Sequence, residues 1–201
     1  GWIAVLVRFG TMTLGQVLEP AIEYAERGHP LDAFVATSIS RSRELLERYP
    51  STAAVFLPDG TLPVEGQLFR YPDLARTFHK LVEAEETARL DGVSRETGLR
   101  AAFNRFYRGD IAARIADDCK AGGGALSRSD FEDYRVEKRL PLTVDYRGAR
   151  LYTNPPPSTG GILIAFALEL LKETDVKALE FGSLGLLQCL ARVMELTNKA
   201  R

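Results

Sequence analysis

Apolar residues recur every three or four positions through most of the first 140 residues, which predicts a run of helices. The first helix begins at Thr13, where Gln16 completes a capping box, and it ends before Gly28. Its apolar face contains Leu14, Val17, Leu18, Ile22 and Ala25. A second helix is predicted from Asp32 to the residue before Pro50. The residues that it turns inward are Val35, Ile39, Leu46 and Tyr49.

Apolar residues show no regular spacing between Pro50 and Pro72, and turn-forming residues are frequent there. We therefore predict an irregular surface loop. The apolar residues that hold this loop against the rest of the chain are Val55, Phe56, Leu62 and Phe69. Helical spacing returns at Pro72. The inward residues of the helix that begins there are Leu74, Phe78, Leu81 and Val82.

Three more helices complete this helical part. One is predicted from Gly98 to Tyr107. The next is capped by Asp110 and stops in a left-handed turn at the glycine run 122–124. A second capping box, Ser129–Glu132, opens a short helix that extends through Tyr134.

The apolar period changes near Pro141. Alternating positions predict strands over residues 142–146 and 149–153, and Arg147–Gly148 between them indicates a hairpin. The next helix is apolar almost all round, which predicts burial on more than one side. The last helix carries Leu187, Leu190, Ala191 and Met194 on one face. These patterns predict an α+β fold, mainly α, with a helical part over residues 1–140 and a hairpin with helices over residues 141–201.

The turn between the hairpin and the apolar helix is the strongest candidate site. Three prolines, 155–157, keep the chain extended, and Ser158 or Thr159 is placed to cap the helix. Gly160 and Gly161 leave its first N–H groups exposed, so the turn can hold a carboxylate or another anion. The alternative is a structural helix start whose glycines allow close packing against the sheet. The residues favour the structural interpretation and leave both open.

Charge and composition exclude several other functions. Of 201 residues, 45% are apolar and 26% are charged, which is typical of a globular protein with a sizeable core. The formal net charge of −1 gives no electrostatic footprint for a nucleic acid or an anionic membrane. No stretch is long and apolar enough for a membrane span.

The sequence contains no complete catalytic set, and it predicts no metal and no cofactor. Cys119 and Cys189 have no zinc-type spacing and are interpreted as buried free thiols. His29 and His79 have no partner at the spacing of a metal site or a triad. The carboxylates Glu83, Glu85, Glu86, Asp117 and Asp118 are placed on solvated helix faces.

Six segments, taken in order, form a larger pattern. They are Arg8–Ile22, Phe56–Gly60 with Pro72–Thr77, Phe106–Ala112, Gly123–Tyr134, Tyr146–Gly148 and Pro155–Gly161. In this order they resemble signature segments of the gamma-glutamyltranspeptidase family, in which the proline–serine–glycine turn lies near the end of the large subunit. Thr159 stands where that signature often has a second Ser. The resemblance covers nearly all of the chain.

The resemblance implies an N-terminal-nucleophile hydrolase with an αββα core. Residues 1–140 would form the helical lobe of the large subunit, and residues 141–201 would contribute a hairpin and helices to the core. In this family a precursor cuts itself, and the new N-terminal Thr of the small subunit attacks a gamma-glutamyl amide such as glutathione. The freed α-amine serves as the base for its own hydroxyl. The acyl group then passes to water, an amino acid or a peptide.

The same resemblance places the catalytic residues outside this chain. The Arg that grips the substrate carboxylate would precede Gly1, and the nucleophilic Thr would follow Arg201. The implied partners are the small subunit of the same precursor and, in the full-length parent, a gamma-glutamyl substrate. We therefore expect the chain alone to be inactive. We also expect it to expose part of residues 162–171 and the hairpin edge, and to self-associate.

Two alternatives stay open at this point. A parent of the same fold could act on another amide, such as poly-gamma-glutamate or a beta-lactam side chain. A noncatalytic helical interaction module could instead keep the scaffold without a downstream Thr junction.

Overall fold

The computed structural model describes residues 1–200, and it divides into two compact units. Unit 1 comprises residues 1–136, and unit 2 begins at Glu137. The elements of unit 1 are α1 (Trp2–Phe9), α2 (Leu14–Arg27), β1 (His29–Pro30), α3 (Ala33–Arg41), α4 (Arg43–Glu47), α5 (Pro50–Phe56), the 3₁₀ turn η1 (Pro58–Gly60), β2 (Leu68–Phe69), α6 (Pro72–Leu90), α7 (Arg95–Tyr107), α8 (Asp110–Ala121) and α9 (Arg128–Glu132). Those of unit 2 are β3 (Leu142–Tyr146), β4 (Ala149–Thr153), α10 (Thr159–Lys172), the 3₁₀ turn η2 (Val176–Ala178) and α11 (Leu184–Lys199). The α+β fold, mainly α, is confirmed.

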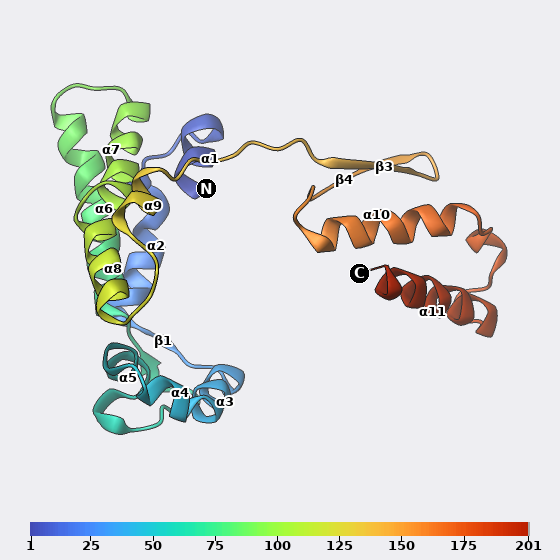
Figure 1. Cartoon of the computed structure of the whole chain (residues 1–201), viewed down its shortest axis with the longest axis horizontal. Coiled ribbons are helices and arrows are strands. Elements are labelled where there is room, and N and C mark those ends of the chain that lie inside the picture. The colour runs from blue at the N-terminus through green and yellow to red at the C-terminus, as the bar shows by residue number, and fades with distance from the viewer. Residues whose placement is uncertain (201) are drawn as a thin grey trace. The chain divides into compact units, whose positions relative to one another are not determined.

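The main core of unit 1 lies among α2, α6, α7 and α8, which gather in one helical group in Figure 1. Its buried residues are Leu14, Leu81, Leu99, Ala102 and Ile111. The predicted faces are confirmed at these positions of α2 and α6, but Val17 and Leu74 are exposed. The face that each helix buries is therefore narrower than its apolar stripe.

A second core in unit 1 joins α3, α4 and α5 to the short β1–β2 ladder. Its buried residues are Leu31, Ile39, Leu57 and Phe69, and Val55, Phe56 and Leu62 pack against them as predicted. The prediction of an irregular loop from Pro50 was wrong at its start, because Pro50 is the first residue of α5. The helix predicted from Asp32 breaks at Ser42, and Tyr49 is 58% exposed.

The capping residues of the helices are partly those predicted. Thr13 Oγ1 accepts from Gln16 N at 3.1 Å, and Thr13 N donates to Gln16 Oε1 at 2.9 Å, which confirms the first capping box. The second box begins at Ser127 and not at Ser129, and Ser127 N donates to Asp130 Oδ2 at 2.7 Å. The helix stop at the glycine run is confirmed, since Gly123 has a φ of 76°.

Asp110 does not cap α8, because Gly109 takes that position and Asp110 is the first helical residue. Its carboxylate accepts from Arg105 Nε and, at 2.7 Å, from Lys80 Nζ. The hydrogen bond from Arg105, followed by that from Lys80, lowers the pKa of Asp110 to about 2. The carboxylate therefore connects α6, α7 and α8 instead of closing one helix end.

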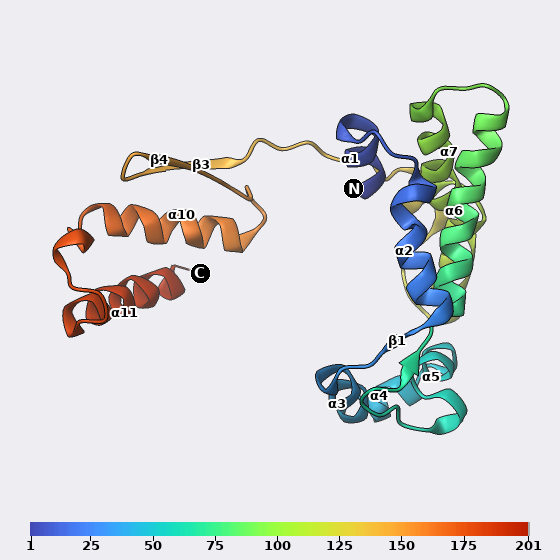
Figure 2. The same ribbon diagram turned by 180° about the vertical axis from the view of Figure 1, so that it is seen from behind.

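Unit 2 consists of layers in which the β3–β4 hairpin packs on α10 and α10 packs on α11 (Figures 1 and 2). The two strands pair antiparallel from Leu142 opposite Thr153 to Tyr146 opposite Ala149, as predicted. Arg147 and Gly148 both have positive φ, 49° and 83°, which suits a two-residue type I′ turn.

The helices of unit 2 leave much apolar surface uncovered. α10 contacts both the hairpin and α11, as burial on more than one side requires, but only Gly161 and Ala165 are buried within residues 1–200, so the burial is less complete than predicted. The exposed large apolar residues of the two helices are Ile162, Ile164, Phe166, Leu184, Leu187, Leu190 and Met194. The predicted face of α11 points outward, and Val193 and Thr197 face inward instead. Among the described residues, no helix has the length and apolar content that a bilayer crossing requires.

Candidate functional site

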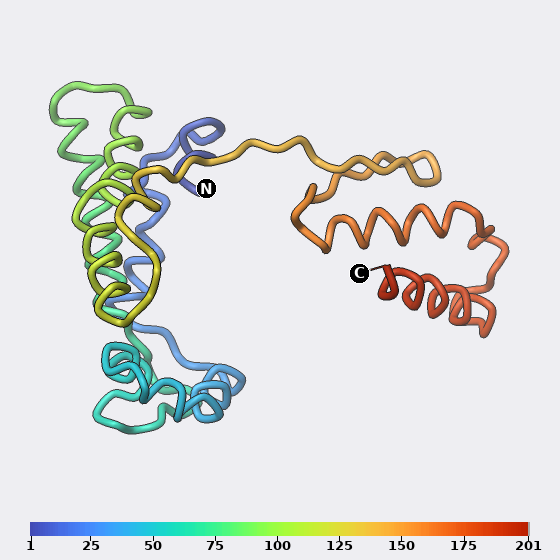
Figure 3. The backbone as a smooth tube through the Cα atoms, viewed as in Figure 1, coloured from blue at the N-terminus to red at the C-terminus, as the bar shows by residue number. Residues whose placement is uncertain are grey.

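The turn of residues 154–158 connects β4 to α10, and the backbone reverses its direction there (Figure 3). Ser158 N donates to the carbonyl oxygen of Pro155 at 3.1 Å, which closes the turn. Arg139 Nη1 donates to the carbonyl oxygen of Pro156 at 3.0 Å, and Glu137 holds the same guanidinium. The Pro156–Pro157 peptide is cis. The closed turn and the Arg139 contact together hold the approach to α10.

Ser158 occupies the N-cap position of α10, as predicted, but its side chain makes no hydrogen bond to the first turn. The prediction of a side-chain cap was therefore wrong, although the helix begins at the expected place. Ser158 is half-buried, whereas Thr159 and Gly160 are exposed. The first N–H groups of α10 consequently lack a side-chain acceptor from the cap, and they carry the partial positive charge of a helix start.

The two glycines of the turn differ in their surroundings. Gly161 is buried, and a Cβ atom there would collide with the backbone of Asn154, most severely with its carbonyl oxygen. At Gly160, which is exposed, a Cβ atom would meet nothing within 4 Å. Close backbone packing against the end of the hairpin therefore explains Gly161 alone. Nothing in the packing requires glycine at 160.

Glu85 is the residue that the sequence interpretation missed. The sequence pattern places it with Glu83 and Glu86 on a solvated face, but Glu85 is only 1% exposed, whereas Glu83 and Glu86 are exposed. Its Oε2 accepts from Leu14 N at 2.8 Å and from Gly15 N at 3.4 Å, while Oε1 has no hydrogen-bond partner within the described chain. A carboxylate from α6 thus caps the start of α2.

The histidines and cysteines do not gather into a site. His79 Nε2 lies 2.7 Å from Glu26 Oε1 in a solvent-exposed pair, and the His29 ring stacks on Tyr71 with centroids 6.1 Å apart. Cys119 and Cys189 are free, and both are half-buried rather than buried. In the part of the chain that the structure describes, no three His, Cys, Asp or Glu side chains lie together as a metal site would require.

Comparison with known proteins gives one consistent family. The family description "Gamma-glutamyltranspeptidase" matches residues 1–201. The chain is 34% identical over 196 residues to "Acylase ACY 1 proenzyme" of Pseudomonas sp. (strain V22), covering 98% of the chain and 32% of that protein. It is also 34% identical over 198 residues to "Glutathione hydrolase proenzyme" of Bacillus subtilis (strain 168), covering 98% of the chain and 30% of that protein.

A solved structure supports the same relationship. The gamma-glutamyltranspeptidase of Helicobacter pylori superposes with a TM-score of 0.83 at 29% identity, over 98% of this chain and 52% of that one. The chain spans about a third of the length of the curated relatives it matches.

Proposed function

The chain belongs to the gamma-glutamyltranspeptidase family, and from this we propose that it is part of an enzyme that cleaves gamma-glutamyl amides of the glutathione type. The enzyme would transfer the acyl group to water, amino acids or peptides. The observation that carries this proposal is the family match over residues 1–201. The B. subtilis relative, whose name states glutathione hydrolysis, supports the substrate class.

Within such an enzyme, the chain would form part of the large subunit. Residues 1–140 would be its helical lobe, and residues 141–201 would contribute the hairpin and helices of an αββα core. Exposed apolar residues on α10 and α11 support a partner for this part, and the small subunit of the same precursor fits that role. The two curated relatives are named proenzymes, which agrees with a precursor that is processed.

We assign the Ser158–Gly161 turn a supporting role beside the substrate. The first amides of α10 lack a side-chain acceptor from the cap, so an anionic group in the parent could bind there. Gly161 would hold this helix start against the hairpin, while Ser158, Thr159 and Gly160 would form its outer side. The reacting Thr would come from the small subunit.

The proposal predicts that the 201-residue chain will not release the chromophore from a gamma-glutamyl anilide, whereas the full-length parent will. The reason is that the hydroxyl and the α-amine of the N-terminal Thr both belong to the small subunit. Absorbance assays of both proteins at equal concentration test this, with far-UV circular dichroism to show that the chain is folded. Turnover by the folded chain alone would contradict the division of roles.

The uncovered face of unit 2 also predicts self-association of the isolated chain. Sedimentation should give a mass that rises with concentration, and an apolar dye should bind and fluoresce. Ile164→Lys on α10 should reduce both signals. Leu74→Lys, which changes a similarly exposed apolar residue of unit 1, should leave them nearly unchanged. A monomeric wild-type chain that binds no dye would contradict the uncovered interface.

The acylase relative favours one alternative, in which the parent acts on another amide. Substrate profiling of the parent separates the two functions, because a gamma-glutamyl anilide, poly-gamma-glutamate and a beta-lactam side-chain amide can be compared under the same conditions. Preference for the beta-lactam side chain or for poly-gamma-glutamate would replace the glutathione-type assignment without changing the family.

A further inference from the structure

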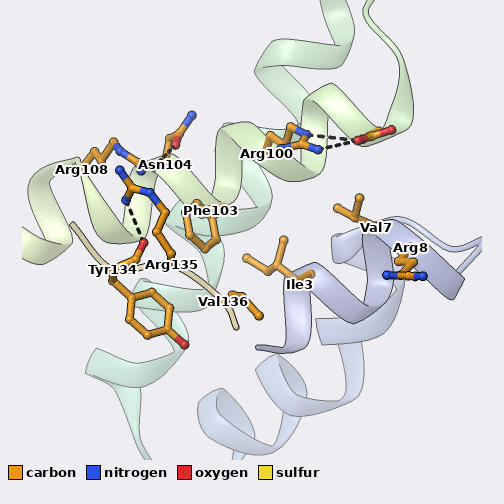
Figure 4. A pocket seen from close by; sticks show the side chains of 12 residues that line it. Ile3, Val7, Arg8, Arg100, Phe103, Asn104, Arg108, Tyr134, Arg135 and Val136 are labelled. Carbon is orange, nitrogen blue, oxygen red and sulfur yellow. Dashed lines mark hydrogen bonds and ion pairs between the residues drawn. The ribbon is translucent and has the colours of Figure 1, made fainter. Parts of the chain in front are cut away.

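A cavity of about 800 Å³ opens in unit 1 between α1, α7 and residues 134–136 (Figure 4). Its volume lies within the range of small-molecule sites. The apolar part of its wall consists of Ile3, Ala4, Val7, Phe103 and Val136. Four arginines and one glutamate also line it, so its charged wall is mainly positive.

Two of these arginines converge on a single backbone atom. Arg108 Nη2 donates to the carbonyl oxygen of Glu132 at 3.4 Å, and Arg135 Nη1 donates to the same oxygen at 2.6 Å. In Figure 4 their side chains lie at the same end of the cavity, near the Phe103 ring. Because each guanidinium has five N–H donors, most of the donors in this pair are not used by the shared carbonyl.

Local contacts hold both guanidinium groups in place. Arg108 Nη1 donates to Asn104 Oδ1 at 2.6 Å, and the Arg108 Cζ lies 5.7 Å from the centroid of the Phe103 ring. Arg135 Nη1 also donates to the carbonyl oxygen of Tyr134 at 2.9 Å. The pair is therefore positioned before any ligand binds, which lowers the entropic cost of binding.

No carboxylate neutralises the pair within residues 1–200, where neither arginine takes part in an ion pair. The side chain of Glu132 bonds to Arg128 instead, at 2.8 Å from Nε. Arg100, another arginine of the same cavity, differs because it forms an ion pair with Glu96 at 2.7 Å. Two positive charges on exposed side chains therefore lie beside an apolar wall, an arrangement that suits an anion carrying an apolar group.

We propose that this cavity binds a small molecule that has a carboxylate and an aromatic or aliphatic group. Arg108 and Arg135 hold the carboxylate, and Phe103 with its apolar neighbours covers the rest. The proposal rests on the geometry of unit 1 and does not depend on the reaction of the parent.

The test titrates the 201-residue chain with 4-phenylbutyrate as the probe. Binding is measured by ligand-observed NMR. Saturable binding is expected, and the uncharged 4-phenylbutyramide should bind at least about 10-fold more weakly, because charge-assisted hydrogen bonds are lost. Arg108→Gln should weaken phenylbutyrate binding by about 10-fold for the same reason. Arg114→Gln is the matched control, since Arg114 is an exposed α8 residue that does not line the cavity, and it should leave the affinity unchanged.

Any one of four results would overturn the proposal. The first is the absence of saturable binding, and the second is equal affinity for the acid and the amide. The third is an equal loss in the Arg108 and Arg114 variants, which would show attraction by overall charge only. Arg135→Gln gives an independent measurement if Arg108→Gln lowers the melting temperature. A folded Arg135 variant with wild-type affinity would likewise overturn the assignment of the pair.

Discussion

Replacing Glu85 by alanine is expected to lower the free energy of unfolding of unit 1 by about 3 kcal/mol. The change removes the acceptor of Leu14 N, which donates to Glu85 Oε2 at 2.8 Å in a buried position. It also leaves a cavity beside α6, because the Glu85 side chain is fully buried. Urea denaturation followed by circular dichroism measures the loss, and hydrogen exchange at the amides of Leu14 and Gly15 locates it.

The size of this effect follows from how the start of α2 is completed. The third amide of the helix, Gln16 N, bonds to the Thr13 side chain, and Thr13 N bonds back to Gln16. The first two amides, those of Leu14 and Gly15, have Glu85 as their acceptor. Because a side chain of α6 supplies what the local capping box lacks, Glu85→Ala removes a contact between α6 and α2 as well as the cap of α2.

Glu86→Ala is the matched control, because it removes the same chemical group from the next residue, which is exposed. Its effect should stay within about 0.5 kcal/mol. Glu85→Gln should lie between the two, since an amide oxygen can still accept from Leu14 N. Equal stability of the Glu85→Ala and Glu86→Ala variants would show that the buried carboxylate does not stabilise the fold.

The position of Glu85 was within reach of the sequence. Phe78, Leu81 and Val82 define the inward face of α6, and Glu85 follows at the next position of the same helical repeat. The residue type points to the opposite conclusion, because a carboxylate is usually exposed unless it is paired. Its partners are backbone amides that are distant in the sequence, and no sequence pattern within α6 indicates them.

Other differences between the sequence predictions and the structure also arise from contacts between distant residues, or from residues whose local sequence fits two positions. Pro50 is compatible with the end of one helix or with the first turn of another. Because α5 packs into the second core, Pro50 is the first residue of α5. Ser127 and Ser129 both precede an acidic residue by three positions, so local spacing alone did not separate them. The β3–β4 hairpin was predictable because the alternation of apolar and polar residues and the Arg147–Gly148 turn both indicate a hairpin.

For the candidate site, the sequence located the turn but not the roles of its residues. The two glycines look equivalent in sequence, and only the position of the Asn154 carbonyl distinguishes Gly161 from Gly160. Local sequence does not indicate the guanidinium pair of Arg108 and Arg135 either, because the two residues are separated by α8 and α9 and meet at one carbonyl. The family resemblance, by contrast, depended on several local segments in order and was confirmed.

Replacing Gly161 by alanine is expected to lower the free energy of unfolding of unit 2 by about 3 kcal/mol, because an added methyl group would overlap the Asn154 backbone. Neither partner can relieve this overlap by a change of rotamer, since the obstructing atoms are backbone atoms at the end of the hairpin. The start of α10 must move away from β4 instead. Hydrogen exchange of the β3–β4 and α10 amides measures the loss directly, and denaturation gives its size.

Gly160→Ala is the matched control, because the methyl group at position 160 meets open space. Alanine has the higher helix propensity, so this variant should be more stable than the wild type by about 0.5 to 1 kcal/mol. If Gly161→Ala were tolerated as well as Gly160→Ala, the Asn154 contact would not determine the turn, and the glycine pair would require an explanation from a bound group. Opposite signs for the two variants would instead assign Gly161 to packing and leave the outer side of the helix start, at Thr159 and Gly160, available to an anion in the parent.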